Sequence, residues 1–273
     1  MKSRNNGVRA RLLIFGVLAA ALILCSFFAE HMTPYDPYLQ DLTIAKQAPS
    51  AEHLLGTDRY GRDMLSRVIA GSRASIFSTL LLVAVITAVG TAVGITCGWI
   101  GGWVDTVLMR ISDVFLAFPG LVFALAVAGS LGGGLQNAII ALAAISWPKY
   151  ARIARSQTLT QKETTWMKAV RLSGSGTGKI ILKHILPNII SVILVTVTLD
   201  FAGCMLTESS LSYLGFGVNL PRPTWGNMLD GSKNSLVIQS YWWRWLFPAL
   251  FLSIVVICIN IIGDTKRDVL DPK

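Results

Sequence analysis

A glycine-rich stretch that ends in a lysine, Gly174-Ser-Gly-Thr-Gly-Lys179, has the residue types of a loop that holds a nucleotide phosphate. A Walker loop requires G-x-x-x-x-G-K-[ST], because backbone N–H groups surround the phosphates and a hydroxyl reaches magnesium. Around Gly178 and Lys179 this pattern fails twice, since Ser173 replaces a glycine and Ile180 replaces the hydroxyl residue. The dinucleotide pattern G-x-G-x-x-G also fails, because a lysine occupies the third glycine position. We therefore expect this chain to bind no nucleotide or other cofactor itself.

The same stretch suits a turn between two short helices. The sequence predicts one helix over residues 160–172, with Gly174 in the left-handed conformation that follows many helix C-termini. Thr177 is placed to cap a second helix over residues 178–186, and Pro187 marks its end. Such a basic knuckle is either a solvated loop or a docking surface, and its charge alone favours the solvated loop.

Other chemistry-bearing residues are scattered. Paired metal or disulfide spacings such as C-x-x-C do not occur among the four cysteines, and the three histidines are equally far apart. Neither a Ser/His/Asp arrangement nor the H-E-x-x-H pattern is found. We therefore expect no metal site and no catalytic site in this chain. The residues concerned are Cys25, Cys97, Cys204, Cys258, His31, His53 and His184.

The composition is that of a membrane protein. The chain of 273 residues is 53% hydrophobic and 14% charged, whereas soluble domains contain about 25% charged residues. A membrane-spanning helix needs roughly 20 apolar residues, and the apolar residues here are concentrated in blocks. The net charge of +9 requires no nucleic acid, because cytoplasmic loops of membrane proteins collect Lys and Arg.

The blocks predict an all-α integral membrane protein with six spans. The run 149–183 carries eight bases against the single acid Glu163, which places it in the cytoplasm. Four crossings before this run and two after it put both termini in the cytoplasm, with an uncleaved first helix. The expected spans are about Leu12–Ala29, Ala74–Trp99, Val107–Gly129, Leu135–Ser146, Ile189–Ser209 and Trp245–Ile262.

Two groups of charged residues have open interpretations. Asp58, Arg59, Arg62, Asp63 and Arg67 precede the second span on the outside. They either contact a partner protein or form an internal salt-bridge cluster that shapes the external loop, and the second interpretation is favoured.

Two acids belong to the fifth span. Acids inside a membrane are costly and usually face a cavity or a partner. Asp200 lies deeper and is the better candidate for a translocation path, whereas Glu208 is expected near the outer end, in contact with water.

Several motifs resemble the permeases of ABC importers. "KAVRLSGSGTGKIILKHILPN" is similar to their EAA loop, with Ala169, Gly174, His184, Leu186 and Pro187 at the expected spacing. Lys168 replaces the glutamate of the motif and Val170 its second alanine. "LLGTDRYGRDMLSRVIAGSR" and "LTESSLSYLGFGVNLPRPTWGNML" resemble the C-type subunit of the branch that imports dipeptides, oligopeptides and nickel chelates. The resemblance covers about residues 29–272.

The resemblance implies a type I ABC-importer permease fold and a set of partners. It implies a multi-pass protein of the bacterial inner membrane that forms a heterodimer with a homologous permease. Two cytoplasmic ATPase subunits would bind ATP and Mg²⁺, and an extracytoplasmic solute-binding protein would deliver the cargo. It also makes the knuckle a docking surface for an ATPase, with Lys168, Ala169, Gly174, Thr177, His184, Leu186 and Pro187 as the coupling residues.

The resulting domain division has three parts. Residues 1–29 form the cytoplasmic tail and first helix, residues 30–73 an external loop, and residues 74–273 a five-helix core with the coupling loop at about 160–188. Peptides are the expected cargo, and nickel or a metal chelate is the alternative within the same branch. A carrier driven by an ion gradient is a different class, but it would more often show inverted repeats, and no clear repeat is present.

Overall fold

The computed structural model describes residues 2–229 and 233–270, and their secondary structure is helical apart from one isolated bridge between Thr57 and Asp63. The predicted first and last domains, residues 1–29 and 74–273, include residues outside this described part, namely residue 1 and residues 230–232 and 271–273. The helices are α1 (Lys2–Phe27), α2 (Ala29–Met32), η1 (Leu42–Ile44), α3 (Met64–Ile100), α4 (Gly102–Ala117), α5 (Gly120–Ser130), α6 (Leu135–Glu163), α7 (Thr165–Leu172), α8 (Thr177–Ile180), the π-helical turn η2 (Ile181–Ile185), α9 (Leu186–Tyr213), α10 (Trp225–Met228), α11 (Ser235–Ser240) and α12 (Trp243–Leu270).

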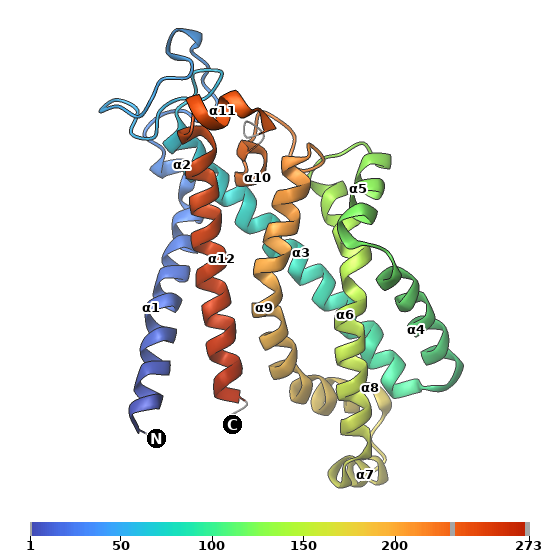
Figure 1. Ribbon diagram of the computed structural model, residues 1–273. Helices are drawn as coiled ribbons and strands as arrows, with labels where there is room; N and C mark the ends of the chain where they lie inside the picture. Colours follow the sequence, from blue (N-terminus) through green and yellow to red (C-terminus); the bar gives the residue numbers. More distant parts are fainter. Residues whose placement is uncertain (1, 230–232, 271–273) are drawn as a thin grey trace.

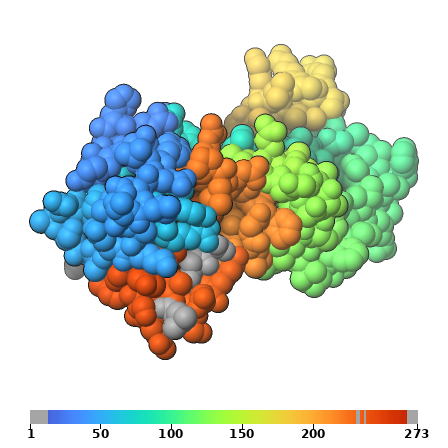
Figure 2. Space-filling view, turned by 90° about the horizontal axis from the view of Figure 1, so that it is seen from above, coloured from blue at the N-terminus to red at the C-terminus, as the bar shows by residue number. Residues whose placement is uncertain are grey.

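The long helix α3 crosses the molecule obliquely and connects its two sides (Figure 1). On one side α1 packs against α12, and on the other α6 packs against α4 and α5, while α9 lies between them. The segment 33–63 covers one end of the helices, and α7 protrudes from the opposite end, where α1 begins and α12 finishes (Figure 1). From above, the segment 33–63 (blue) and the region of α11 (orange-red) form one part of the surface and α4–α6 (green) another (Figure 2).

The tightest helix contact is between α3 and α6, where glycines repeat every fourth residue. A Cβ atom on Gly90 would lie 2.5 Å from Cβ of Tyr150, and one on Gly94 would lie 2.3 Å from the Ala151 carbonyl oxygen. A Cβ atom on Gly98 would lie 2.8 Å from Cβ of Thr158. Small residues allow helix backbones to approach closely in membranes, so this stripe determines how near the two helices lie.

Two hydrophobic clusters hold the rest together. One joins α3, α5, α6 and α9 and extends into the helices that follow α6, through buried residues such as Leu142, Met167 and Ile189. The other joins α3, α9, α10 and α12 around Trp225, whose indole nitrogen donates to the Val68 carbonyl at 3.0 Å.

Within the described residues, three helical stretches are long and apolar enough to cross a membrane: Met64–Ile100, Thr177–Tyr213 and Trp243–Thr265. A fourth crossing follows if α4 and α5 count as one span, but they are bent by 93° relative to each other. The predicted third span is therefore not a single helix, because Phe118 adopts an extended conformation and a new helix begins after Pro119.

Three other predicted boundaries also differ from the structure. Helix α3 begins at Met64, ten residues earlier than the predicted core, because the Asp63 carboxylate accepts a bond from the Ser66 N–H at 2.7 Å and caps the helix. Helix α6 continues through Pro148 to Glu163, so residues 160–163 belong to it rather than to the first helix of the knuckle.

Candidate coupling surface and polar sites

Helix α7 is held against the bundle by one buried side chain. Met167 is fully buried in the same cluster as Ile180 and Ile185, which belong to α8 and η2. The Trp166 and His184 rings lie 6.1 Å apart, which adds a second contact between the two arms of the knuckle. The knuckle is thus anchored by packing rather than suspended as a loose loop.

Two cations contact the end of α3, one from the end of α6 and one from α7. The Lys162 ammonium donates to the Trp99 carbonyl at 2.6 Å, close to the helix C-terminus, where cations are favoured. The Arg171 guanidinium lies 4.5 Å from the centre of the Trp99 ring. Movement of α7 would therefore be transmitted to α3.

The opposite face of α7 is open. Leu172 is 89% exposed, and Lys168 and Ala169 are also exposed. Gly174 has a φ of +75° directly after the helix, as the sequence predicted. Leu182, on the neighbouring turn, is 67% exposed. An apolar, positively charged surface thus faces outward at this end of the protein.

Two local predictions about the knuckle are wrong. Thr177 is the first residue of α8 rather than its cap, because Gly176 takes the cap position and no side chain bonds the helix end. Pro187 does not end a helix, since it lies in the first turn of α9, directly after the π-helical turn η2. His184 and Leu186 are half-buried and lie in the continuous run from α8 through η2 into α9.

The basic run of α6 is neutralised by acids from other helices. Lys149 pairs with Asp200 of α9, and Arg155 pairs with Asp105 of α4 at 2.5 Å. Arg152 pairs with Asp113 of α4, also at 2.5 Å. The spacing of three residues places these bases on one face of α6. These pairs were missed in the sequence, although the three-residue spacing of the bases was a signal for them.

Of the two candidate translocation acids, one is placed differently from the prediction. Glu208 does not contact water, since it is fully buried and accepts a bond from the Ser212 hydroxyl at 2.9 Å. It is buried because α10 packs on this part of α9, so that a Cβ on Gly226 would lie 2.5 Å from the Ser209 carbonyl oxygen. Asp200 is partly exposed and bonded to Lys149.

The external charged group is an internal cluster, which was the favoured interpretation. Asp58 binds the Arg62 guanidinium at 2.6 Å and lies 3.6 Å from Nε of Arg67. Asp63 binds His53 at 2.9 Å as well as capping α3. These five side chains are buried.

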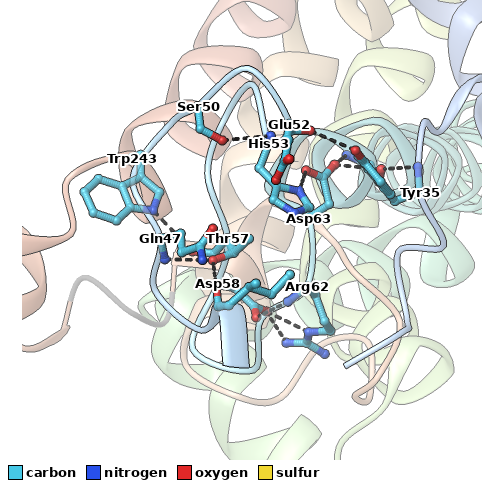
Figure 3. A network of polar contacts seen from close by, with 12 residues as sticks. Tyr35, Gln47, Ser50, Glu52, His53, Thr57, Asp58, Arg62, Asp63 and Trp243 are labelled. Carbon is cyan, nitrogen blue, oxygen red and sulfur yellow. Dashed lines mark hydrogen bonds and ion pairs between the residues drawn. The ribbon is translucent and has the colours of Figure 1, made fainter. Parts of the chain in front are cut away.

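Figure 3 shows how the neighbouring loop closes over this cluster. The Trp243 indole donates to the Thr57 carbonyl at 3.2 Å, so α12 is tied to the loop. Trp243 is buried and faces this contact rather than lipid. Arg59 alone among the five candidates is exposed, with its guanidinium 4.7 Å from the Tyr60 ring. A contact between Arg59 and a partner stays a prediction.

These features define a class first. A bundle with several apolar helices, cross-helix ion pairs and an anchored, protruding knuckle is that of a multi-pass membrane protein. The chain belongs to the family of binding-protein-dependent transport system inner membrane components, whose model matches residues 90–273. It is thus the permease component of an ABC importer in the inner membrane.

Relatives and a solved structure agree with this family. The chain is 37% identical over 273 residues to a Brucella suis biovar 1 protein with the provisional name of peptide transport system permease, covering all of this chain and 89% of that protein. It is 37% identical to the glutathione transport system permease protein GsiD of Pectobacterium atrosepticum, covering 94% of this chain and 85% of GsiD. An inward-facing structure of the MetNI methionine ABC transporter shares the fold, with a TM-score of 0.59 and 20% identity over 76% of this chain and 97% of that one.

Proposed function

We propose that the chain is the membrane-spanning subunit of an ATP-driven importer for short peptides, and that α7 is the element through which ATP hydrolysis drives it. The single observation that carries this proposal is the anchored knuckle: Met167 is buried, whereas Leu172 on the same helix is 89% exposed. A rigid element with one exposed apolar face is suited to transmit the movement of a docked partner.

The coupling residues differ in what they contribute. Lys168, Ala169 and Leu172 form the contact surface for an ATPase subunit, and Gly174 allows the chain to turn back. Thr177, His184, Leu186 and Pro187 connect that surface to α9 through the continuous helical run. Because Lys168 replaces the acid of the EAA motif, we expect the docked ATPase to present a neutral or acidic surface there.

The expected partners and topology follow from this role. Two cytoplasmic ATPase subunits bind ATP and Mg²⁺, a homologous permease completes a heterodimer, and a solute-binding protein docks on the segment 33–63. Six crossings place both termini on the side of α7, and the position of α1 and α12 in Figure 1 supports this topology. The bent pair α4 and α5 serves as one of the crossings, and α6 as another, because its charged residues are paired with acids of other helices.

Alternating access then requires two sets of helix contacts. A ligand or partner shifts such an equilibrium only through different contacts in the two states. The Lys149–Asp200 pair joins α6 to α9, so a rearrangement of these two helices would change this contact. Asp200 is therefore the translocation-path residue in this proposal, and buried Glu208 has a structural role.

Peptide is the preferred cargo because the relatives are named for peptides and glutathione. Nickel is not favoured, and among the described residues no group of three His, Cys, Asp or Glu side chains could hold a metal. The test is uptake into proteoliposomes that contain the complete transporter. We expect dipeptide uptake that requires ATP and the binding protein and is abolished by vanadate. Uptake that follows an ion gradient and ignores vanadate would contradict the proposal.

A further inference from the structure

A pocket of about 360 Å³ opens at the end of the molecule that carries the segment 33–63. One wall comes from residues 58–67 of the external loop and the start of α3. The opposite wall comes from the end of α9, the chain that follows it, and α10. Its size falls in the range of small-ligand sites.

The pocket carries an excess of positive charge. Among the described residues, Arg59, Arg62 and Arg67 line it together with one acid, Asp58. Arg244 also lines the pocket but has a contact of its own, so it is left out of the count. Three guanidinium groups and one carboxylate leave two positive charges, so this part of the pocket is complementary to an anion.

The Asp58 carboxylate is already fully engaged. It accepts bonds from Nε of Arg62 at 2.7 Å and from the backbone N–H groups of Tyr60 and Arg62 at 2.7 and 3.0 Å. The Arg67 guanidinium is 3% exposed, donates to the Pro37 carbonyl at 3.0 Å and lies 3.6 Å from the same carboxylate. A guanidinium has five N–H donors. Arg62 and Arg67 share the Asp58 carboxylate and therefore retain N–H donors for a carboxylate of a ligand.

The remaining walls suit a ligand with apolar and amide parts. Met64, Val218 and Leu220 provide apolar surface, and Asn219 provides a side-chain amide. The Ser212 hydroxyl donates its hydrogen to buried Glu208, which leaves its oxygen to accept a bond from a ligand N–H. A guanidinium also matches the geometry of a carboxylate.

We propose that this pocket binds the terminal carboxylate of a short peptide, as an outer recognition site in the permease itself. The inference rests on the proposed peptide cargo. The arginines hold the carboxylate, and the apolar wall contacts the side chain next to it. An acidic side chain of a docked binding protein is the competing occupant, and the experiment separates the two.

The probe is radiolabelled dialanine, added to the complete transporter in nanodiscs without the binding protein and measured by equilibrium dialysis. Dialanine amide, which lacks the carboxylate, serves as the competitor. Arg59→Gln is the test variant, because Arg59 is exposed and its guanidinium stacks on Tyr60 without an ion pair in the described part of the chain. Arg59→Lys is the conservative variant, and Arg222→Gln is the control, since Arg222 is exposed on the chain between α9 and α10 but is not among the residues that line the pocket.

We expect saturable dialanine binding that is about tenfold weaker in Arg59→Gln, unchanged in Arg222→Gln and partly restored in Arg59→Lys. The amide should compete at least about tenfold less well than dialanine. Equal competition by the amide, or equal binding by Arg59→Gln and Arg222→Gln, would overturn the inference. Absence of dialanine binding, with a crosslink from Arg59 to an acidic residue of the binding protein, would overturn it in favour of the competing occupant. ATP-driven dialanine uptake by the wild type, measured in parallel, shows whether the peptide-import proposal fails as well.

Discussion

The glycine stripe between α3 and α6 gives the sharpest stability prediction. In Gly94→Ala, the new Cβ would lie 2.3 Å from the Ala151 carbonyl oxygen and 2.7 Å from Cβ of Ala154. The first distance is about 1 Å short of ordinary contact. Both atoms are held in place by the α6 backbone, so α3 and α6 must move apart.

The magnitude follows from two opposing effects. Overpacking by one methyl group typically destabilises a protein by about 1–3 kcal/mol. Alanine also favours the helix over glycine by about 1 kcal/mol, which offsets part of the loss. Gly16→Ala in α1 is the matched control, because it has the same helix preference and no atom within 4 Å of the new Cβ. The difference between the two variants therefore isolates the clash, at about 1–3 kcal/mol.

The assay is thermal unfolding of the purified protein in detergent. For a chain of roughly this length, a loss of 1 kcal/mol in the free energy of unfolding lowers Tm by roughly 2–4 °C. We expect the Tm of Gly94→Ala to lie several degrees below that of Gly16→Ala, which should equal or exceed the wild type. If the two variants have the same Tm, the close approach of α3 and α6 is not what the stripe provides.

Three further predictions concern the cap, the ion pair and the turn. Asp63→Ala removes the α3 cap and the partner of His53, so the free energy of unfolding should fall by about 0.5–2 kcal/mol. Asp63→Asn keeps a capping oxygen and should lose less stability. Equal Tm values for Asp63→Ala and the wild type would contradict the capping role. Asp200→Lys should lower peptide uptake, and the exchanged pair Lys149→Asp/Asp200→Lys should restore part of it, whereas no restoration would show that the pair itself is not required. Gly174→Trp forces a bulky residue into a φ of +75°, so peptide-stimulated ATPase activity should fall, and normal coupling would contradict the role of the turn.

The sequence predicted the elements better than their ends. Apolar block lengths located the main helices, and the charge run located the knuckle, because both depend on local composition. The angle of 93° between α4 and α5 could not be predicted, since a proline inside an apolar block is compatible with either a kink or a break. The continuation of α6 through Pro148 was missed because its bases appear unpaired until α4 and α9 are folded beside them.

The polar sites were predictable to different degrees. The salt-bridge cluster around Asp58 was the favoured interpretation because its acids and bases lie close in the chain. The burial of Glu208 could not be predicted, because it depends on α10 packing against α9 from a distant part of the sequence. The cap of α8 was misplaced by one residue, since a glycine takes the position that a threonine usually prefers.

The central claim, that α7 contacts the ATPase, is tested most directly by photo-crosslinking. A benzoylphenylalanine residue replaces Leu172, which is 89% exposed on α7, and Leu131 at the opposite end serves as the control, since it is 47% exposed. In the assembled transporter, the account predicts a covalent adduct between position 172 and an ATPase subunit, and none from position 131. An active transporter in which position 172 gives no adduct with the ATPase, or in which position 131 does, would contradict it.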